Sequence, residues 1–236
     1  MAAADGNRHR VLTVDVGGSH VKVLLSTSGY ERRRFPSGPN LTAQQMVEDV
    51  LEATKDWEYD VVTVGVPTPV MAGKIAHDPV NLGEGWVGFD FEQAFGVPTR
   101  VVNDAVMQAL GSYDGGRMLF LGLGTGLGSA FIVDGVLEPL ELGHLPFRKK
   151  TFEEYVSTQA LERFGKKKWT KAVFEVVDRL TRAMQPDYVV IGGGGAKDLK
   201  TLPPGCRRGD NRLAFVGGFR LWDPAWAQRT SVGESR

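Results

Sequence analysis

Two glycine-rich turns, each following a run of apolar and β-branched residues, are the strongest constraint on how this chain can fold. The first lies in Asp15-Val-Gly-Gly-Ser-His-Val-Lys22, and the second lies in Leu123-Gly-Thr-Gly-Leu-Gly128. Because glycine has no Cβ, backbone N–H groups in such turns can approach a phosphate group closely. We therefore predict two walls of one phosphate-donor site, formed by Gly17, Gly18, Ser19, Lys22, Gly124, Thr125 and Gly126.

The segments after these turns exclude two common nucleotide-binding motifs. A P-loop or a Rossmann turn leads directly into a helix, whereas residues 21–26 have the β-branched pattern of a strand. We expect each turn to join a β-hairpin, with strands at 11–16 and 21–26 and again at 118–122 and 130–133. This recurrence predicts an internal duplication.

Helix and strand signals alternate along the rest of the chain. Thr42 and Gln45 form a capping-box pattern before an apolar face of Met46, Val47, Val50 and Leu51. Further strands are expected at 61–66, 100–103 and 188–191, and helices at 105–110, before Gly111, and from about Trp169 to Pro186. The final apolar segment, 213–222, is predicted to be helical despite two glycines.

Composition limits the partners and the compartment. The 236 residues carry 28 Lys+Arg and 28 Asp+Glu, so no overall field attracts nucleic acid or an anionic membrane. The single cysteine, Cys206, excludes an internal disulfide, and no apolar run of 18 residues predicts a membrane span. We expect a cytoplasmic protein.

Two carboxylates are candidates for the chemistry. Asp104 lies at a strand-to-helix junction, where it could accept a proton as a catalytic base or could merely cap the helix. Asp15 lies in an otherwise apolar strand and needs a cation, a donor or water, although a bond to the adjacent turn would also satisfy it. Lys22 could hold a phosphate as a point charge or could be an exposed strand lysine.

The order and spacing of these motifs resemble the ROK family of sugar kinases, within the actin-like ATPase superfold, and in it the bacterial polyphosphate glucokinases. The resemblance covers the chain from about Val11 to Trp222. Beside the two turns, it rests on Gly65-Val-Pro67, Asn81-Leu82, Asn103-Asp104, Glu141-Leu-Gly-His144, Gly165-Lys-Lys-Lys-Trp169 and Ile191-Gly-Gly-Gly-Gly195.

The resemblance implies an α/β, two-lobed, ribonuclease-H-like fold with the active site in the cleft between the lobes. We expect an N-terminal lobe at 1–108, a C-terminal lobe at 109–222 and a tail at 223–236. By resemblance Asp104 takes the proton from the sugar's 6-hydroxyl, and Asp15 holds Mg²⁺ through water. Gly193 and Gly194 join the donor site, and the sugar is bound by Asn81, Asn103, Asp104, Glu141 and His144.

The implied reaction transfers a terminal phosphoryl group from polyphosphate or ATP, with Mg²⁺, to glucose, and the implied assembly is a homodimer. Two alternatives remain: an ATP-only kinase for another hexose or an N-acetylated aminosugar, and a sugar-binding protein without activity. A DNA-binding regulator is not expected, because no helix-turn-helix segment precedes the first strand.

The chain departs from the family in several places. With one cysteine it cannot form the zinc loop that many ROK proteins carry. Basic runs at 148–150 and 166–168 could line a polyphosphate path or could be solvated helix ends. Thr68 stands where the family often has glycine, so the resemblance does not specify the details of the sugar-binding loop.

Overall fold

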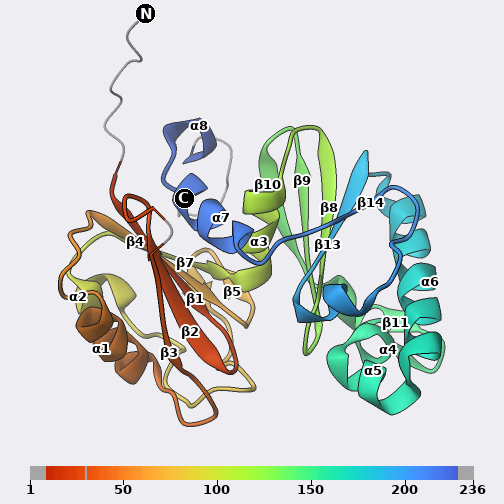
Figure 1. Ribbon diagram of the computed structural model, residues 1–236, viewed down its shortest axis with the longest axis horizontal. Coiled ribbons are helices and arrows are strands. Elements are labelled where there is room, and N and C mark those ends of the chain that lie inside the picture. The colour runs from red at the N-terminus through yellow and green to blue at the C-terminus, as the bar shows by residue number, and fades with distance from the viewer. Residues whose placement is uncertain (1–8, 30, 228–236) are drawn as a thin grey trace, which may run out of the picture. The chain divides into compact units, whose positions relative to one another are not determined.

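The computed structural model describes residues 9–29 and 31–227 (Figure 1). The chain divides into two compact units. The first contains residues 1–107 together with 215–236, and the second contains residues 108–214. Each unit has its own five-stranded sheet and its own apolar core.

The sheet of the first unit has the strand order β3-β2-β1-β4-β7. Its strands are β1 (Val11–Val16), β2 (His20–Leu25), β3 (Arg32–Pro36), β4 (Val61–Val66) and β7 (Thr99–Asn103). The first three are antiparallel neighbours, while β1, β4 and β7 are parallel. β4 is buried along its whole length, as expected for a central parallel strand.

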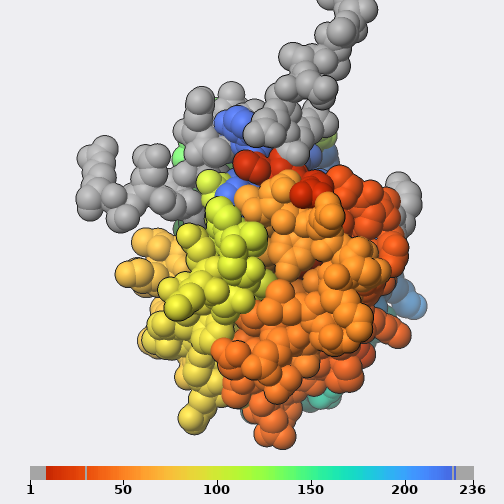
Figure 2. Space-filling view, turned by 90° about the vertical axis from the view of Figure 1, so that its left-hand side faces the viewer, coloured from red at the N-terminus to blue at the C-terminus, as the bar shows by residue number. Residues whose placement is uncertain are grey.

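Two helices of the first unit cover one face of this sheet and contact each other: α1 (Ala43–Ala53) and α2 (Phe91–Phe95). Figure 2 shows the outer surface of this unit, where orange and yellow atoms adjoin. Thr42 caps α1 by accepting a hydrogen bond from the N–H of Gln45, as predicted. Met46, Val47 and Val50 are buried in the core, but Leu51 is 38% exposed, so the predicted apolar face is one residue too wide. A short hairpin, β5 (Val70–Met71) and β6 (Lys74–Ile75), follows β4.

The C-terminal segment belongs to the first unit, whereas the sequence placed residues up to 222 in the second lobe. Helix α7 (Leu213–Arg220) packs on β1 and β4 from the other face of the sheet. Thr63 Oγ1 donates to the Gly218 carbonyl at 2.9 Å and accepts from Trp222 Nε1 at 2.9 Å. Arg100 stacks 4.4 Å from the Trp222 ring and bonds the Leu221 carbonyl.

Residues 223–227 also differ from the flexible tail that was expected. They include a short helix, α8 (Pro224–Ala227), while the rest of that predicted tail, 228–236, lies outside the described residues.

The second unit repeats the strand order of the first, as β10-β9-β8-β13-β14. The strands are β8 (Arg117–Leu123), β9 (Leu127–Val133), β10 (Val136–Leu140), β13 (Tyr188–Gly192) and β14 (Cys206–Arg208). Two antiparallel pairings are again followed by two parallel ones. The hairpin turn of β9 and β10 has positive φ at Asp134 and Gly135, the geometry of a type I′ turn.

Helices α4 (Glu153–Val156), α5 (Thr158–Phe164) and α6 (Lys166–Met184) cover one face of the second sheet (Figure 1). α6 buries one apolar stripe, from Trp169 to Leu180, and ends at Gln185 in a left-handed conformation immediately before Pro186. Two short 3-10 helices, η1 (Leu142–His144) and η2 (Gly194–Asp198), also belong to this unit. So does a short hairpin of β11 (Pro146–Phe147) and β12 (Lys150–Thr151).

Helix α3 (Asp104–Ser112) connects the two units along the chain. It runs through Gly111, which was expected to end it, because the backbone N–H and carbonyl groups of a glycine can still join a helix. Within the part of the chain that the structure describes, no helix is both long and apolar enough to cross a bilayer.

Candidate active site

The first glycine turn joins β1 to β2 and is tightly closed. The N–H of Gly17 donates to the carbonyl of His20 at 3.0 Å, and the Ser19 carbonyl accepts from the N–H of Ser37 at 3.0 Å. A Cβ on Gly17 would lie 3.1 Å from the His20 oxygen, so this glycine closes the turn. A Cβ on Gly18 would meet only Asn81 Cβ, at 3.6 Å. The predicted sugar residue Asn81 therefore lies beside the first turn.

Asp15 and Lys22 lie opposite each other in the β1–β2 ladder. Lys22 Nζ donates to Asp15 Oδ2 at 3.2 Å, and the side chains are 34% and 13% exposed. Asp15 thus has a cationic partner, and part of its surface stays accessible. Lys22 is thus a half-buried strand lysine rather than an exposed one, and it is held at the base of the predicted phosphate turn. Its binding of phosphate stays a prediction.

Asn103, the last residue of β7, holds the start of α3. Its Oδ1 accepts from the N–H of Ala105 at 2.9 Å, and its Nδ2 donates to the carbonyl of Thr68 at 3.0 Å. Asn103 therefore supplies the side-chain cap that the sequence also allowed for Asp104. Both the oxygen and the nitrogen of its side-chain amide are therefore hydrogen-bonded to backbone groups of the protein.

Asp104 is the first residue of α3, and its carboxyl group has the most perturbed pKa among the predicted site residues. Burial, and next the nearby negative charge of Asp15, raise the pKa of Asp104 to about 7. The N–H of Ala105 and the charge of Lys22 oppose this change. A carboxyl group whose pKa lies near neutrality is well suited to exchange a proton with a substrate hydroxyl.

In the second unit, the corresponding turn joins β8 to β9. The N–H of Gly124 donates to the Gly126 carbonyl at 3.1 Å, and Thr125 is exposed at its tip. A Cβ on Gly126 would lie 2.8 Å from Glu153 Oε2, whereas a Cβ on Gly124 would meet nothing within 4 Å. The Gly124 carbonyl accepts from the N–H of Thr158, which ties the turn to α5.

Glu141, His144 and Glu153 form a second group of polar side chains in this unit. His144 Nε2 lies 3.6 Å from Glu153 Oε1, and Gly143 leaves room for the same carboxylate. Partial burial raises the pKa of Glu141; the charge of His144 lowers this pKa, and the charge of Glu153 raises it further. The predicted sugar residues are thus close together: Glu141 immediately precedes η1, and His144 is its last residue.

Glu153 is a candidate that the sequence analysis missed. In the sequence, Thr151 and Glu154 form a second capping-box pattern, which drew attention to Glu154 instead. The Glu154 carboxylate does accept a hydrogen bond from the N–H of Thr151 at 3.1 Å. The available signal was an acidic pair just after the basic run at 148–150, and it did not distinguish Glu153 from Glu154. The glycines at 126 and 143 identify Glu153, because both would clash with it if they carried a Cβ.

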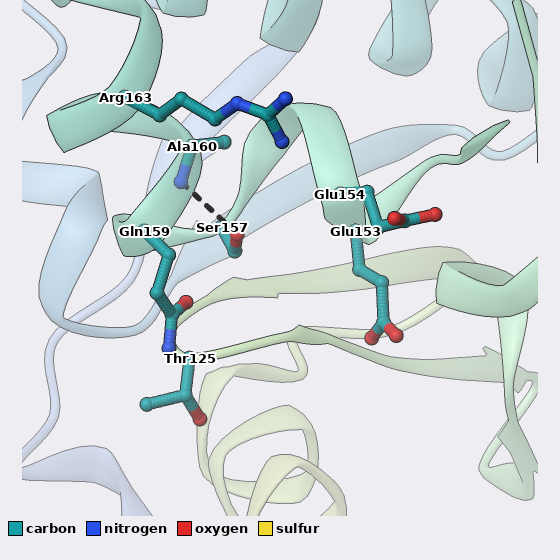
Figure 3. A pocket seen from close by; sticks show the side chains of 7 residues that line it. All are labelled: Thr125, Glu153, Glu154, Ser157, Gln159, Ala160 and Arg163. Atoms are coloured by element: carbon teal, nitrogen blue, oxygen red, sulfur yellow. Dashed lines mark hydrogen bonds between the residues drawn. The ribbon is translucent and has the colours of Figure 1, made fainter. Parts of the chain in front are cut away.

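A pocket of about 260 Å³ opens beside the second turn. Figure 3 shows Thr125 at one end, the Gln159 amide pointing toward it, and the Arg163 guanidinium at the other end. The remaining lining residues are Glu153, Glu154, Ser157 and Ala160. Every lining residue except Ala160 has a polar or charged side chain, so the pocket offers several hydrogen-bonding groups to a hydrophilic ligand.

The third glycine segment follows β13. Gly193 has φ of +78°, and a Cβ there would lie 2.4 Å from the Leu123 carbonyl oxygen, so the fold requires a glycine. Gly194 is exposed and has nothing within 4 Å of its Cβ position. At three glycines the surrounding structure would leave room for a Cβ: Gly18, Gly124 and Gly194. Open backbone of this kind is what a phosphate chain needs in order to approach N–H groups.

Known proteins with similar sequences indicate what this arrangement of residues belongs to. No family model matches the chain. A polyphosphate glucokinase of Mycobacterium tuberculosis is 28% identical over 202 residues, which are 77% of this chain and 76% of that protein. The polyphosphate glucokinase of Mycobacterium leprae is 26% identical over 213 residues, 81% of this chain, but the alignment spans only 65% of the Mycobacterium leprae protein.

Solved structures extend the likeness to the whole fold. An inorganic polyphosphate/ATP-glucomannokinase from Arthrobacter sp. strain KM superposes with a TM-score of 0.75 at 26% identity, covering 89% of this chain and 96% of that one. In sequence and in fold, the chain is similar to sugar kinases of the ROK family. A ROK glucokinase from Streptomyces griseus, solved with glucose and AMPPNP, shares the fold with a TM-score of 0.74 at 16% identity, covering 90% and 99% of the two chains.

The chain therefore has the fold of these kinases, the actin-like ATPase fold that the sequence predicted. The repeated strand order of its two sheets agrees with the internal duplication expected from the glycine turns. Kinship with proteins named polyphosphate glucokinase and glucokinase supports the expected enzyme class, a phosphotransferase of the hexokinase type.

Proposed function

We propose that this protein is a ROK-family kinase that transfers a terminal phosphoryl group to the 6-hydroxyl of glucose, with inorganic polyphosphate or ATP as donor. One observation carries the proposal: the carboxyl group of Asp104, at the start of α3, has a pKa of about 7 and lies close enough to Asp15 to feel its charge. A base with such a pKa is ready to take a proton from an alcohol near neutral pH.

The chain's own groups divide the work as follows. Asp104 accepts the proton of the sugar hydroxyl as the oxygen attacks the donor's terminal phosphorus. Asn103 fixes the start of α3, and so orients Asp104, through its bonds to Thr68 and Ala105. The empty Cβ positions of Gly18 and Gly124 let donor oxygens approach the backbone of the two turns, and the ammonium of Lys22 offsets the charge of these oxygens.

Magnesium fits the first unit. Asp15 and Asp104 are two carboxylates that repel each other electrostatically, and a hard divalent cation prefers such oxygen ligands. Asp15 would hold the ion, in part through water. When bound, the ion neutralises charge on the donor phosphates. Among the described residues there is no cluster of three or more His, Cys, Asp or Glu side chains.

For the acceptor, we propose that Glu141, His144 and Glu153 bind sugar hydroxyls, together with Asn81. A carboxylate accepts two hydroxyl hydrogens, and an imidazole can donate or accept, so the group suits vicinal hydroxyls. The alternative acceptors, another hexose or an N-acetylated aminosugar, are compared in the experiment below. The homodimer that the resemblance implies also stays a proposal.

A donor-by-acceptor matrix tests this function. Polyphosphate and ATP are each offered with glucose, mannose and N-acetylglucosamine, and sugar 6-phosphate formation is measured with magnesium present. We expect glucose 6-phosphate, and we expect Asp104→Asn to lower turnover by about a hundredfold or more while glucose binding, measured by calorimetry, persists. Full turnover in Asp104→Asn would remove Asp104 as the base. Glucose binding without turnover in the wild type would favour a sugar-binding protein.

A further inference from the structure

The face of the first sheet that carries Asp15 is covered unequally. Helix α7 packs over β1 and β4, because Gly218 meets Thr13 and bonds Thr63, and Met107 of α3 packs at Gly65. On β2 the alternate residues of this face, His20, Lys22 and Leu24, are exposed or half-buried. The β2–β3 half of the face is therefore accessible, unlike the half beneath α7.

Side chains on this open half are cationic. Lys22 lies opposite Arg34 in the β2–β3 ladder, and Leu24 lies opposite Arg32. Since neighbouring strands lie about 4.8 Å apart, Asp15, Lys22 and Arg34 form one row across three strands. The row begins at the carboxylate of Asp15 on β1, just before the first glycine turn, and ends at the edge strand β3.

Arg34 and Arg32, which lie on the open face of β3, differ from Arg33 between them. Arg33 points to the opposite face, where Glu31, Asp56 and the Ala53 carbonyl bind its guanidinium. Arg32 and Arg34 are exposed, and within residues 9–29 and 31–227 neither makes an ion pair or a side-chain hydrogen bond. Two unpaired guanidinium groups beside a half-buried ammonium favour a polyanion over a single small anion.

We propose that Lys22, Arg34 and Arg32 bind the distal phosphate groups of an inorganic polyphosphate chain whose reacting end lies at the first glycine turn. The proposal rests on the proposed function and specifies the donor: a chain longer than the terminal phosphates can cross β2 and leave over the edge strand β3. This path is distinct from the basic runs at 148–150 and 166–168, which belong to the second unit.

Direct binding of polyphosphate tests the path without requiring turnover. Medium-chain inorganic polyphosphate is titrated into the full-length wild type and into Arg32→Gln/Arg34→Gln, with magnesium and without sugar. We expect about tenfold weaker binding in the double variant, since each exposed charge contact contributes roughly threefold. The slope of log affinity against log salt concentration should also become shallower by about two.

Arg182→Gln is the matched control, because Arg182 is an exposed arginine of α6 in the second unit. It removes one positive charge without touching β3, so its polyphosphate affinity should equal that of the wild type. The thermal midpoint of each variant shows whether it is folded. Orthophosphate, a single group that cannot reach β3 from the first turn, should bind the double variant and the wild type equally.

Four results would overturn the proposal: no polyphosphate binding by the wild type, unchanged affinity in the double variant, an equal loss in Arg182→Gln, or equally tight and equally Arg32- and Arg34-dependent binding of a single-stranded oligonucleotide. Unchanged affinity would leave the arginines with an edge-protecting role. Failure of the proposed function is separate. A protein that binds polyphosphate through β3 but phosphorylates no sugar retains the path, whereas one that uses only ATP loses the path and stays a kinase.

Discussion

Asn103 donates a hydrogen bond from Nδ2 to the backbone carbonyl of Thr68 at 3.0 Å, so the end of β7 is tied to the segment that follows β4. The hydroxyl of Thr68 in turn donates to the His77 carbonyl at 2.8 Å, which closes the loop around the β5–β6 hairpin. The position that departs from the family pattern thus supports the residue that caps α3 and orients Asp104.

Replacement of Thr68 by valine tests this support. The side chain keeps its shape but loses the hydroxyl, which frees the His77 carbonyl and lets the Thr68 backbone move away from Asn103. We expect kcat to fall about fivefold, since one hydrogen bond contributes about 1 kcal/mol. Steady-state kinetics with glucose measure it, and Thr68→Ser should restore kcat. Equal kcat in all three proteins would show that the hydroxyl has no positioning role.

The raised pKa of Asp104 predicts how stability depends on pH. The carboxyl group ionises near pH 4 in the unfolded chain and near pH 7 in the folded one, so the folded state holds an extra proton between these values. Its contribution is fully present below pH 4 and is lost as pH rises toward 7. In urea unfolding, Asp104→Asn should gain stability relative to wild type from pH 4 to 7 and then level off. A constant difference across this range would contradict the raised pKa.

Gly218 predicts a stability defect with a specific rescue. A Cβ at this position would lie 2.4 Å from both Oγ1 and Cγ2 of Thr13, inside a packed contact between α7 and β1. Gly218→Ala should therefore cost about 1–3 kcal/mol of unfolding free energy. Adding Thr13→Ala removes both atoms, and the double variant should recover part of the loss. Strictly additive losses in the two single variants would show that the contact is not the cause.

The glycines that the fold does not require separate donor binding from stability. Gly124→Ala adds a Cβ with nothing within 4 Å, so we expect an unchanged unfolding midpoint and a raised KM for the donor. Gly193→Ala, by contrast, meets the Leu123 backbone at 2.4 Å with φ of +78° and should lower the midpoint. Thermal unfolding and donor kinetics check the pair. An unchanged donor KM in Gly124→Ala would remove this turn from the donor site.

Much of the fold could be predicted from local patterns. Residues 61–66 were recognised as a strand because Val61, Val62, Val64 and Val66 leave no polar face, and they form β4 with the predicted bounds. The two hairpins followed from extended residues directly after the glycine turns. These features depend on residues that are neighbours in sequence, which is why a pattern within one window is sufficient.

The parts that could not be predicted depend on contacts distant in sequence. Residues 215–222 belong with the first unit because Trp222 and Gly218 meet Thr63, more than 150 positions earlier. No window that contains only one of these segments reports the pairing. Glu153 was missed for the same reason, since its relation to Gly126, Gly143 and His144 appears only after the chain has folded. The roles of the site residues stay predictions.

The first unit is assembled from both ends of the chain, whereas the second is one uninterrupted stretch. During synthesis, residues 108–214 leave the ribosome exit tunnel before the residues that complete the other unit. Thr63 obtains its indole partner only when Trp222 has left the ribosome exit tunnel. A protein shortened before residue 215 should therefore retain a folded second unit and leave the N-terminal half dependent on chaperones.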